Sequence, residues 1–194
     1  MFSMTWKEIG RMSDNTARHI EINTSVFSIA EESSFGQLNI RLDVTDASLL
    51  SKMKGVLGLN LDIAPNTIVK HNENLALWLG PDERLVLLPK NQIITVEMNL
   101  ERELDGIHYS SVDLSSGQVI LDLKGEEVLN ILSKGCSVDL HQKYFNVGQC
   151  VQTSIDKINV ICFPLENNHI RIIVRRSYSE ALIAWFKDAS IEFV

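Results

Sequence analysis

The sequence lacks the features that mark several large classes of protein. It has three cysteines, too few for a disulfide scaffold, and this number favours a reducing compartment. Basic residues are outnumbered, 18 against 25 acidic, and the net charge of −7 argues against nucleic acids and anionic membranes as partners. No apolar run approaches the ~18 residues that span a bilayer. The N-terminus has no basic segment followed by an apolar run, so we expect no secretory signal and a soluble, cytoplasmic protein.

The glycine-rich motifs that cradle phosphates are also missing. Neither G-x-G-x-x-G nor a P-loop occurs, so the sequence predicts no dinucleotide held by this chain alone. The composition is that of a globular protein, with 45% apolar and 22% charged residues. A length of 194 residues suits one large domain or two small halves.

Residues 36–194 read as two similar halves, each with a strand, a helix, a hairpin and a second helix. The first half begins with a strand at Leu38–Leu42, and Asp46 is the predicted cap of the helix that follows. The second half begins with a strand at Val119–Leu123 and a helix after it. Gly55 and Gly135 are predicted to end these two helices in a left-handed conformation.

Each half continues with an apolar hairpin and an amphipathic helix. The hairpins are predicted over residues 75–88 and 158–174. Asn91 is the predicted cap of the first helix, and Ser177 with Glu180 predicts a capping box for the second. The predicted apolar faces contain Ile93, Val96, Leu100 and Leu104 in the first helix, and Tyr178, Ala181, Leu182, Trp185 and Phe186 in the second.

These patterns predict an α+β fold made of two pseudo-repeated lobes of antiparallel sheet with helices. We expect the lobes at residues 36–110 and 111–194, preceded by an N-terminal arm or strand at residues 1–35. The alternating apolar pattern of this arm ends at Glu31–Ser34. It either packs as a strand on its own chain or lies on a partner.

One stretch, residues 132–153, brings together Cys136, His141 and Cys150 and first suggests a metal or thiol site. Structural zinc sites usually pair ligands two to four residues apart, and none of the three cysteines has a cysteine partner that close. A thiol nucleophile activated by the histidine is the other alternative, but no nucleophile signature surrounds either cysteine. We therefore favour buried structural cysteines, with Cys162 in an apolar strand run, and predict no metal and no catalytic residue.

Arg175 and Arg176 lie where a strand leads into a helix. Such a place can bind an anion through helix amides and guanidinium groups, but ion pairs or a subunit contact are the simpler explanation. We expect a subunit interface at Arg175, Arg176 and Tyr178. Trp78 and Trp185 lie in apolar patterns, which favours core packing over a flavin or pterin wall.

Four segments, taken in order, stand out as a combined signature: Ala64–Thr67, Ala76–Glu83, Lys134–Thr153 and Val174–Tyr178, the last followed by Trp185 and Phe186. Together they resemble the gamma subunit family of heterotetrameric sarcosine oxidase. Arg84 departs from the pattern of that family, which usually has tryptophan after the Pro-Asp-Glu turn, and so lacks an aromatic contact.

The resemblance implies a cytoplasmic complex of alpha, beta, gamma and delta chains. Such a complex oxidatively demethylates sarcosine to glycine, with oxygen as acceptor and tetrahydrofolate taking up the one-carbon unit, and releases hydrogen peroxide. FAD, FMN and NAD belong to the alpha and beta chains and zinc to delta, so the resemblance implies no cofactor in the gamma chain. It implies a structural role against the alpha chain and the folate-binding fold of the glycine-cleavage T-protein.

Two alternatives stay open at the level of the sequence. The same subunit role in a complex that oxidises another N-methylated amino acid is one, because the flavin chain would select the substrate. A free-standing folate-binding protein of the aminomethyltransferase superfamily is the other. The repair-type branch of that superfamily carries Lys-Gly-Cys-Tyr followed by Gly-Gln-Glu, which this chain lacks.

Overall fold

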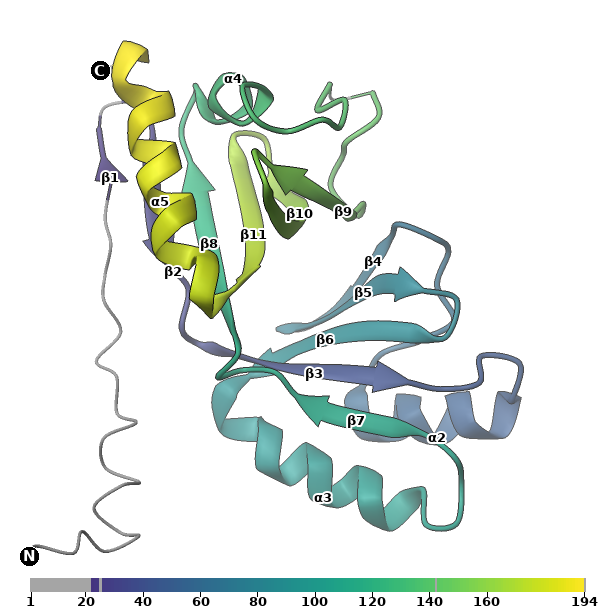
Figure 1. Ribbon diagram of the computed structural model, residues 1–194. Helices are drawn as coiled ribbons and strands as arrows, with labels where there is room; N and C mark the ends of the chain where they lie inside the picture. The colour runs from purple at the N-terminus through teal and green to yellow at the C-terminus, as the bar shows by residue number, and fades with distance from the viewer. Residues whose placement is uncertain (1–21, 25, 142, 194) are drawn as a thin grey trace, which may run out of the picture.

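The computed structural model describes residues 22–24, 26–141 and 143–193 and contains two antiparallel sheets (Figure 1). Sheet A has the strand order β1-β2-β8-β11-β10-β9, and sheet B has the order β4-β5-β6-β3-β7. Helices α4 and α5 pack on one face of sheet A, and α2 and α3 pack on one face of sheet B (Figure 1). The predicted α+β fold of two sheet-and-helix lobes is confirmed. None of the helices formed by the described residues is both long enough and apolar enough to span a bilayer.

The bounds of the elements are as follows. Sheet A consists of β1 (Ile22–Asn23), β2 (Ser28–Glu31), β8 (Gln118–Lys124), β9 (Val151–Ile155), β10 (Ile158–Glu166) and β11 (His169–Arg175). Sheet B consists of β3 (Phe35–Arg41), β4 (Ile68–His71), β5 (Asn74–Gly80), β6 (Glu83–Pro89) and β7 (Ser110–Asp113). The helices are α2 (Ala47–Leu57), η2 (Lys90–Gln92), α3 (Ile93–Glu103), α4 (Val128–Ser133), α5 (Arg176–Ser190) and η3 (Ile191–Phe193).

The two sheets share one topology and exchange a strand. The order β9-β10-β11-β8-β2 in sheet A corresponds to β4-β5-β6-β3-β7 in sheet B. Strand β2 pairs with β8, although the chain runs from β2 directly into β3 of the other sheet. Strand β7 likewise pairs with β3 and then runs into β8. Each half of the chain therefore supplies one strand to the sheet of the other half.

The exchange bears on the N-terminal segment. Its described part forms β1 and β2, so it packs as strands on its own chain, within sheet A. Residues 1–21 lie outside the described residues. The division into an arm and lobes at 36–110 and 111–194 stays a prediction about domains.

Apolar side chains form three layers because alternate residues of a strand face opposite sides. In β8, Leu121 and Leu123 pack toward α5, whereas Ile120 packs against sheet B. The helix-facing layers hold most of the buried apolar residues of each lobe. The middle layer joins the sheets and consists of Leu75, Leu77, Leu85 and Leu87 from sheet B and Ile120, Cys150, Phe163 and Ile173 from the second half of the chain.

The first helix confirms one predicted end and corrects the other. The carboxylate of Asp46 accepts the N–H groups of Ser48 at 2.9 Å and Leu49 at 3.0 Å, as a cap should. The predicted stop at Gly55 is wrong, because α2 continues to Leu57, which is buried. Gly58 ends the helix, with φ of 70°. Burial of one more leucine extends the helix by most of a turn.

Gly135 does not end its helix in a left-handed conformation, so that prediction is also wrong. Helix α4 ends at Ser133, and Gly135 is not among the glycines with positive φ. A Cβ atom at this position would lie 2.4 Å from the ring of Trp185. Glycine is needed here because the backbone and an indole approach each other closely.

The predicted caps of the later helices are wrong as well. Asn91 lies inside η2, and α3 begins at Ile93 without a side-chain cap. Ser177 lies inside α5, whose N-cap residue is Arg175, again without a side-chain cap. Both helices follow their hairpins with almost no intervening loop, so the preceding strand sets where each begins.

The apolar face of α3 is as predicted, since Ile93, Val96, Leu100 and Leu104 are all buried. The face of α5 is correct only in part. Leu182 and Phe186 are buried, but Tyr178 and Ala181 are exposed. The buried stripe runs one position further round and contains Ser179, Leu182, Ile183, Phe186, Ala189 and Ser190.

Candidate functional site between the two sheets

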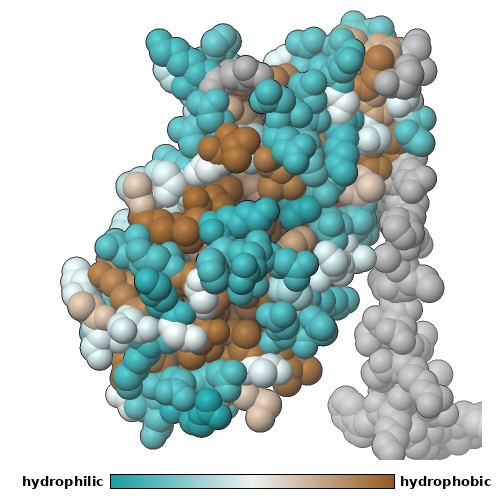
Figure 2. Space-filling view, turned by 180° about the vertical axis from the view of Figure 1, so that it is seen from behind, coloured by the Kyte–Doolittle hydropathy of each residue, from teal (hydrophilic) through white to brown (hydrophobic). Residues whose placement is uncertain are grey.

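The sheets are joined along a backbone seam that is made of residues 66–68, 78–79 and 148–152. The N–H of Ile68 donates to the carbonyl of Gly148 at 2.8 Å, and the N–H of Cys150 donates to the carbonyl of Asn66 at 2.9 Å. Asn66 has φ of 58°, a conformation that asparagine tolerates better than most residues. Viewed from behind, hydrophobic residues are visible across the middle of the molecule, where the lobes meet (Figure 2).

Cys150 lies at the centre of this seam. Its Sγ contacts the carbonyl oxygens of Thr67 at 3.4 Å and Trp78 at 3.5 Å. Burial raises the pKa of the thiol to about 11, so it stays protonated at neutral pH. The amide of Gln152 donates to the carbonyl of Leu79 at 2.7 Å. A protonated thiol that contacts two carbonyls suits a structural role, because a nucleophile would need the thiolate.

The other predicted candidates are kept apart. Cys136 is half-buried, with Sγ 3.9 Å from the hydroxyl of Thr153, and burial raises the pKa of Cys162. His141 is exposed, and its Nδ1 accepts the backbone N–H of Lys143 at 3.1 Å. Within residues 22–24, 26–141 and 143–193, no histidine forms a hydrogen bond with a thiol, and no three His, Cys, Asp or Glu residues form a metal-binding group.

Arg176 connects the sheets at a second place, where the β2–β3 and β7–β8 connections pass each other. We call residues 31–35 and 113–118 the crossing. The guanidinium donates to the carbonyl of Ser116 at 2.8 Å and of Gln118 at 3.3 Å. It also lies 3.8 Å from the carboxylate of Glu31 at the end of β2. Arg176 thus holds both connections and is committed to its own chain.

The two neighbouring residues of the predicted interface differ from Arg176. Arg175 is exposed, and its side chain makes no hydrogen bond or ion pair with the described residues. Tyr178 is 52% exposed, although it is large and apolar. Both side chains are accessible beside the crossing, on the first turn of α5.

A buried ion-pair cluster on the inner face of sheet A escaped prediction. Arg171 binds Asp122 with two bonds of 2.6 and 3.0 Å and lies 3.5 Å from Glu32. Its guanidinium stacks 5.1 Å from the ring centre of Phe35. His169 lies 3.4 Å from the same aspartate, and burial is the main cause that lowers the pKa of this histidine. Charged residues within the apolar runs of β8 and β11 were the signal that could have revealed this cluster.

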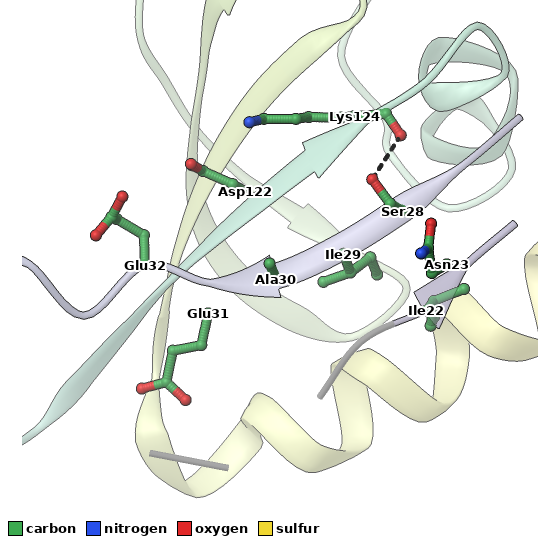
Figure 3. A pocket seen from close by; sticks show the side chains of 9 residues that line it. All are labelled: Ile22, Asn23, Ser28, Ile29, Ala30, Glu31, Glu32, Asp122 and Lys124. Atoms are coloured by element: carbon green, nitrogen blue, oxygen red, sulfur yellow. Dashed lines mark hydrogen bonds between the residues drawn. The ribbon is translucent and has the colours of Figure 1, made fainter. Parts of the chain in front are cut away.

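The cluster borders a cleft of 390 Å³. Figure 3 shows Glu32, Asp122 and Lys124 around it, on β8 and at the end of β2. The carboxylate of Asp122 is already paired with Arg171, and one oxygen of Glu32 accepts the N–H of Ser34 at 2.8 Å. These charges hold the crossing together, and the arrangement supplies no free acid–base pair.

Arg84 is the residue at which the sequence departs from the resemblance noted above. It is 2% exposed and is the largest fully buried side chain among the described residues. Its guanidinium donates to the carbonyls of Leu61 at 2.8 Å, Gly80 at 2.5 Å and Glu83 at 2.9 Å. Burial is the main cause that lowers the pKa of this arginine. The residue ties the β5–β6 turn to the loop after α2 through hydrogen bonds, where an aromatic ring would act by packing.

Comparison with known proteins identifies the family. The sequence model of the sarcosine oxidase gamma subunit family matches residues 41–192. The chain belongs to this family. The resemblance noted from four short segments is therefore confirmed, and three of those segments meet at the seam while the fourth contributes Arg176 to the crossing.

Curated members of the gamma subunit family match part of the chain. The sarcosine oxidase subunit gamma of Corynebacterium sp. (strain U-96) is 34% identical over 119 residues, which are 60% of this chain and 56% of the relative. The subunit gamma of Arthrobacter sp. is 32% identical over 117 residues, 60% and 57% of the two chains. These alignments therefore span little more than half the length of the curated relatives.

Solved structures match over a longer range. A chain of the heterotetrameric sarcosine oxidase from Corynebacterium sp. U-96, in complex with pyrrole 2-carboxylate, superposes with a TM-score of 0.80 at 27% identity, covering 89% of this chain and 88% of that one. The glycine cleavage system aminomethyltransferase T from Bartonella henselae superposes with a TM-score of 0.63 at 11% identity, covering 84% and 45%. The second likeness concerns the fold alone, and it agrees with the predicted T-protein-like fold.

Proposed function

We propose that this chain is the non-catalytic gamma subunit of a cytoplasmic, heterotetrameric sarcosine oxidase. The complex would convert sarcosine to glycine with oxygen and tetrahydrofolate, giving methylene-tetrahydrofolate and hydrogen peroxide. The observation that carries the proposal is the superposition on a chain of a heterotetrameric sarcosine oxidase, which covers nearly the whole of both chains. A subunit that shares its full fold with such a chain is suited to the same place in an assembly.

The interior of the chain supports a structural role. Eight buried side chains fill the space between the two sheets, so a pteridine would have to displace leucines of sheet B or Phe163 and Ile173 to enter there. The seam uses the thiol of Cys150 in its protonated form. The residues between the sheets therefore do not fit a folate. The proposal assigns FAD, FMN, NAD, tetrahydrofolate and zinc to the other subunits.

The proposed partners are the alpha, beta and delta chains, with alpha as the main contact. Arg175 and Tyr178 are accessible at the first turn of α5, and the pairing of Arg176 with the crossing holds that turn in place. An exposed tyrosine beside an uncommitted arginine has the composition typical of interface hot spots. We propose that this turn is part of the contact with alpha.

Co-expression with the three partner chains tests the role. We expect all four chains to elute together as a yellow complex that consumes oxygen when sarcosine is added. Arg175→Ala combined with Tyr178→Ala should weaken incorporation of this chain, whereas Lys157→Ala, an exposed change on the β9–β10 turn, should not. Elution of this chain alone beside a complete complex of the others would contradict the proposal.

The alternatives have their own readouts. Faster turnover of another N-methylated amino acid than of sarcosine would assign the complex to that substrate and keep the subunit role. Calorimetry of the isolated chain with tetrahydrofolate should show no heat of tight binding. Micromolar or tighter binding would instead support a free-standing folate-binding protein.

A further inference from the structure

The two sheets differ by one strand, and the difference marks an open edge. In sheet A, β1 lies outside β2, with Ile22 opposite Ile29. Sheet B has the same order up to β7, which is the counterpart of β2. Among the described residues, no strand occupies the place outside β7. The sheet that carries β7 therefore ends one strand earlier than its counterpart.

The outer edge of β7 presents unpaired backbone groups. The N–H of Leu114 donates to the carbonyl of Gln37 at 2.8 Å, which fixes the alternation of the ladder with β3. The N–H and C=O groups of Ser111 and Asp113 must then face away from β3. The strand contains neither lysine nor proline, the residues that commonly protect an edge. The Oγ of Ser111 is also buried without a hydrogen-bond partner among the described residues.

A flank of α3 beside this edge is apolar and exposed. Ile94 is 72% and Met98 is 65% exposed, and they lie one turn apart on the same flank of the helix as Glu101. Looking along α3 from its N-terminus, with sheet B above the helix, the exposed flank lies clockwise from the buried stripe. In this arrangement the flank is on the side of β7 and points away from α2 (Figure 1). Together with burial, the charge of Glu101 raises the pKa of Tyr109, the residue before β7. Tyr109 also packs against the core that contains the buried stripe of α3, so the start of β7 lies close to this helix.

In the lobe of sheet A, the corresponding side of the helix is covered by an additional strand. There, Ile22 of β1 and Ile183 of α5 belong to one buried core, so the extra strand covers the side of the helix. The equivalent side of α3 has no such cover from the described residues. A strand added outside β7 would pair with the free backbone groups and place alternate side chains over Ile94 and Met98.

We infer that the edge of β7 and the exposed flank of α3 bind an extended segment of another subunit, which adds to sheet B as a sixth strand. This inference rests on the proposed function, because it places the partner in the same complex. Three acidic residues around the edge, Glu101, Asp105 and Asp113, are exposed and make no ion pair with the described residues. The segment therefore has apolar residues facing the helix and at least one lysine or arginine.

The same charges disfavour a second copy of this chain as the occupant. Two β7 edges that paired would bring together the acidic groups of two molecules of net charge −7. A basic segment of a different chain meets complementary charge instead.

The test is an affinity measurement between this chain and the assembled alpha, beta and delta chains. Ser111→Pro removes an outward N–H and leaves the bonds to β3 intact, because only the solvent-facing amide is lost. Met98→Lys places a charge on the exposed flank, and Thr95→Lys is the matched control on another side of the same helix. We expect the first two changes to raise Kd at least tenfold and the control to stay within twofold. Thermal melting checks that each variant is folded.

The outcomes separate the two proposals. Tight binding of wild type with all variants within twofold would overturn the docking site and leave the subunit role standing. Wild type that binds none of the three chains would overturn both. Hydrogen exchange adds a direct readout: the amides of Ser111 and Asp113 should exchange fast in the isolated chain and slowly in the complex.

Two further results would contradict the inferred occupant. Slow exchange in the isolated chain that is lost when residues 1–21 are removed would mean that this chain covers its own edge. A light-scattering mass of two chains that Ser111→Pro reduces to one would identify a second copy.

Discussion

Arg84 offers the sharpest test of how the β5–β6 turn is held against the loop after α2. Replacing it by alanine removes three hydrogen bonds of 2.5–2.9 Å to the carbonyls of Leu61, Gly80 and Glu83, and a longer one of 3.5 Å to the carbonyl of Pro81. Hydrogen bonds to a charged group contribute about 1.5–3 kcal/mol each, and the desolvation of a buried guanidinium offsets several kcal/mol of their sum. Leaving buried carbonyls without donors, together with the cavity, should lower the free energy of unfolding by about 3–5 kcal/mol.

Urea unfolding followed by circular dichroism measures this loss, provided that the slope m stays constant. Arg41→Ala is the matched control. This arginine, on the neighbouring strand β3, lies 2.7 Å from Glu83, the residue next to Arg84, but its side chain is 53% exposed. Its loss should be about 0.2–1 kcal/mol. Arg84→Lys should fall between the two, since one ammonium cannot reach three carbonyls in a fixed fork. A loss below about 1 kcal/mol for Arg84→Ala would refute the reasoning, because it would mean that the buried bonds do no more than replace those to water.

Three other changes are expected to have separate effects. Gly135→Ala should lower stability by about 1–3 kcal/mol in thermal melts, because the added Cβ would lie 2.4 Å from the indole of Trp185. Gly55→Ala should raise stability by about 0.5–1 kcal/mol, because the space around this position in α2 is open. Equal effects of the two changes would contradict this reasoning. Iodoacetamide at pH 8 should label the half-buried Cys136 and spare Cys150, whose pKa is raised to about 11, and mass spectrometry of the folded chain reads the ratio. The folded-state pKa of His169 lies below its usual 6.5, so the unfolded chain binds the extra proton and stability should fall as pH drops below about 6.5. His169→Gln should flatten that part of the pH–stability curve, and an unchanged slope would exclude this residue as its cause.

Local patterns were sufficient where the sequence itself sets the structure. The hairpin at residues 75–88 and the cap at Asp46 follow from alternation, turn chemistry and a side-chain hydrogen bond within three residues. The short strands β4 and β7 were missed because Lys70, His71, Ser110 and Ser111 give them no apolar alternation. Their strand conformation comes from pairing with β5 and β3.

At the candidate site, too, local sequence patterns could not predict contacts between residues far apart in the chain. The role of Gly135 depends on Trp185, fifty positions away in the chain, and no local rule reveals that contact. Asp122 and Arg171 could have been paired in advance, since each interrupts an apolar strand and the strands neighbour each other. The exchange of β2 and β7 could not have been predicted from the sequence, because the alternation of apolar residues in a strand does not identify the strand it pairs with.

The strand exchange also limits how the molecule can move. To swing one lobe away from the other as a hinged domain, the chain would have to strip β2 from β8 and β7 from β3. Arg176 would also have to release Ser116, Gln118 and Glu31. Separating the two lobes would therefore require partial unfolding, because neither connection between the described lobes can bend as a hinge while its strand stays paired. The angle between the two lobes is therefore fixed by backbone pairing, because each lobe holds a strand of the other.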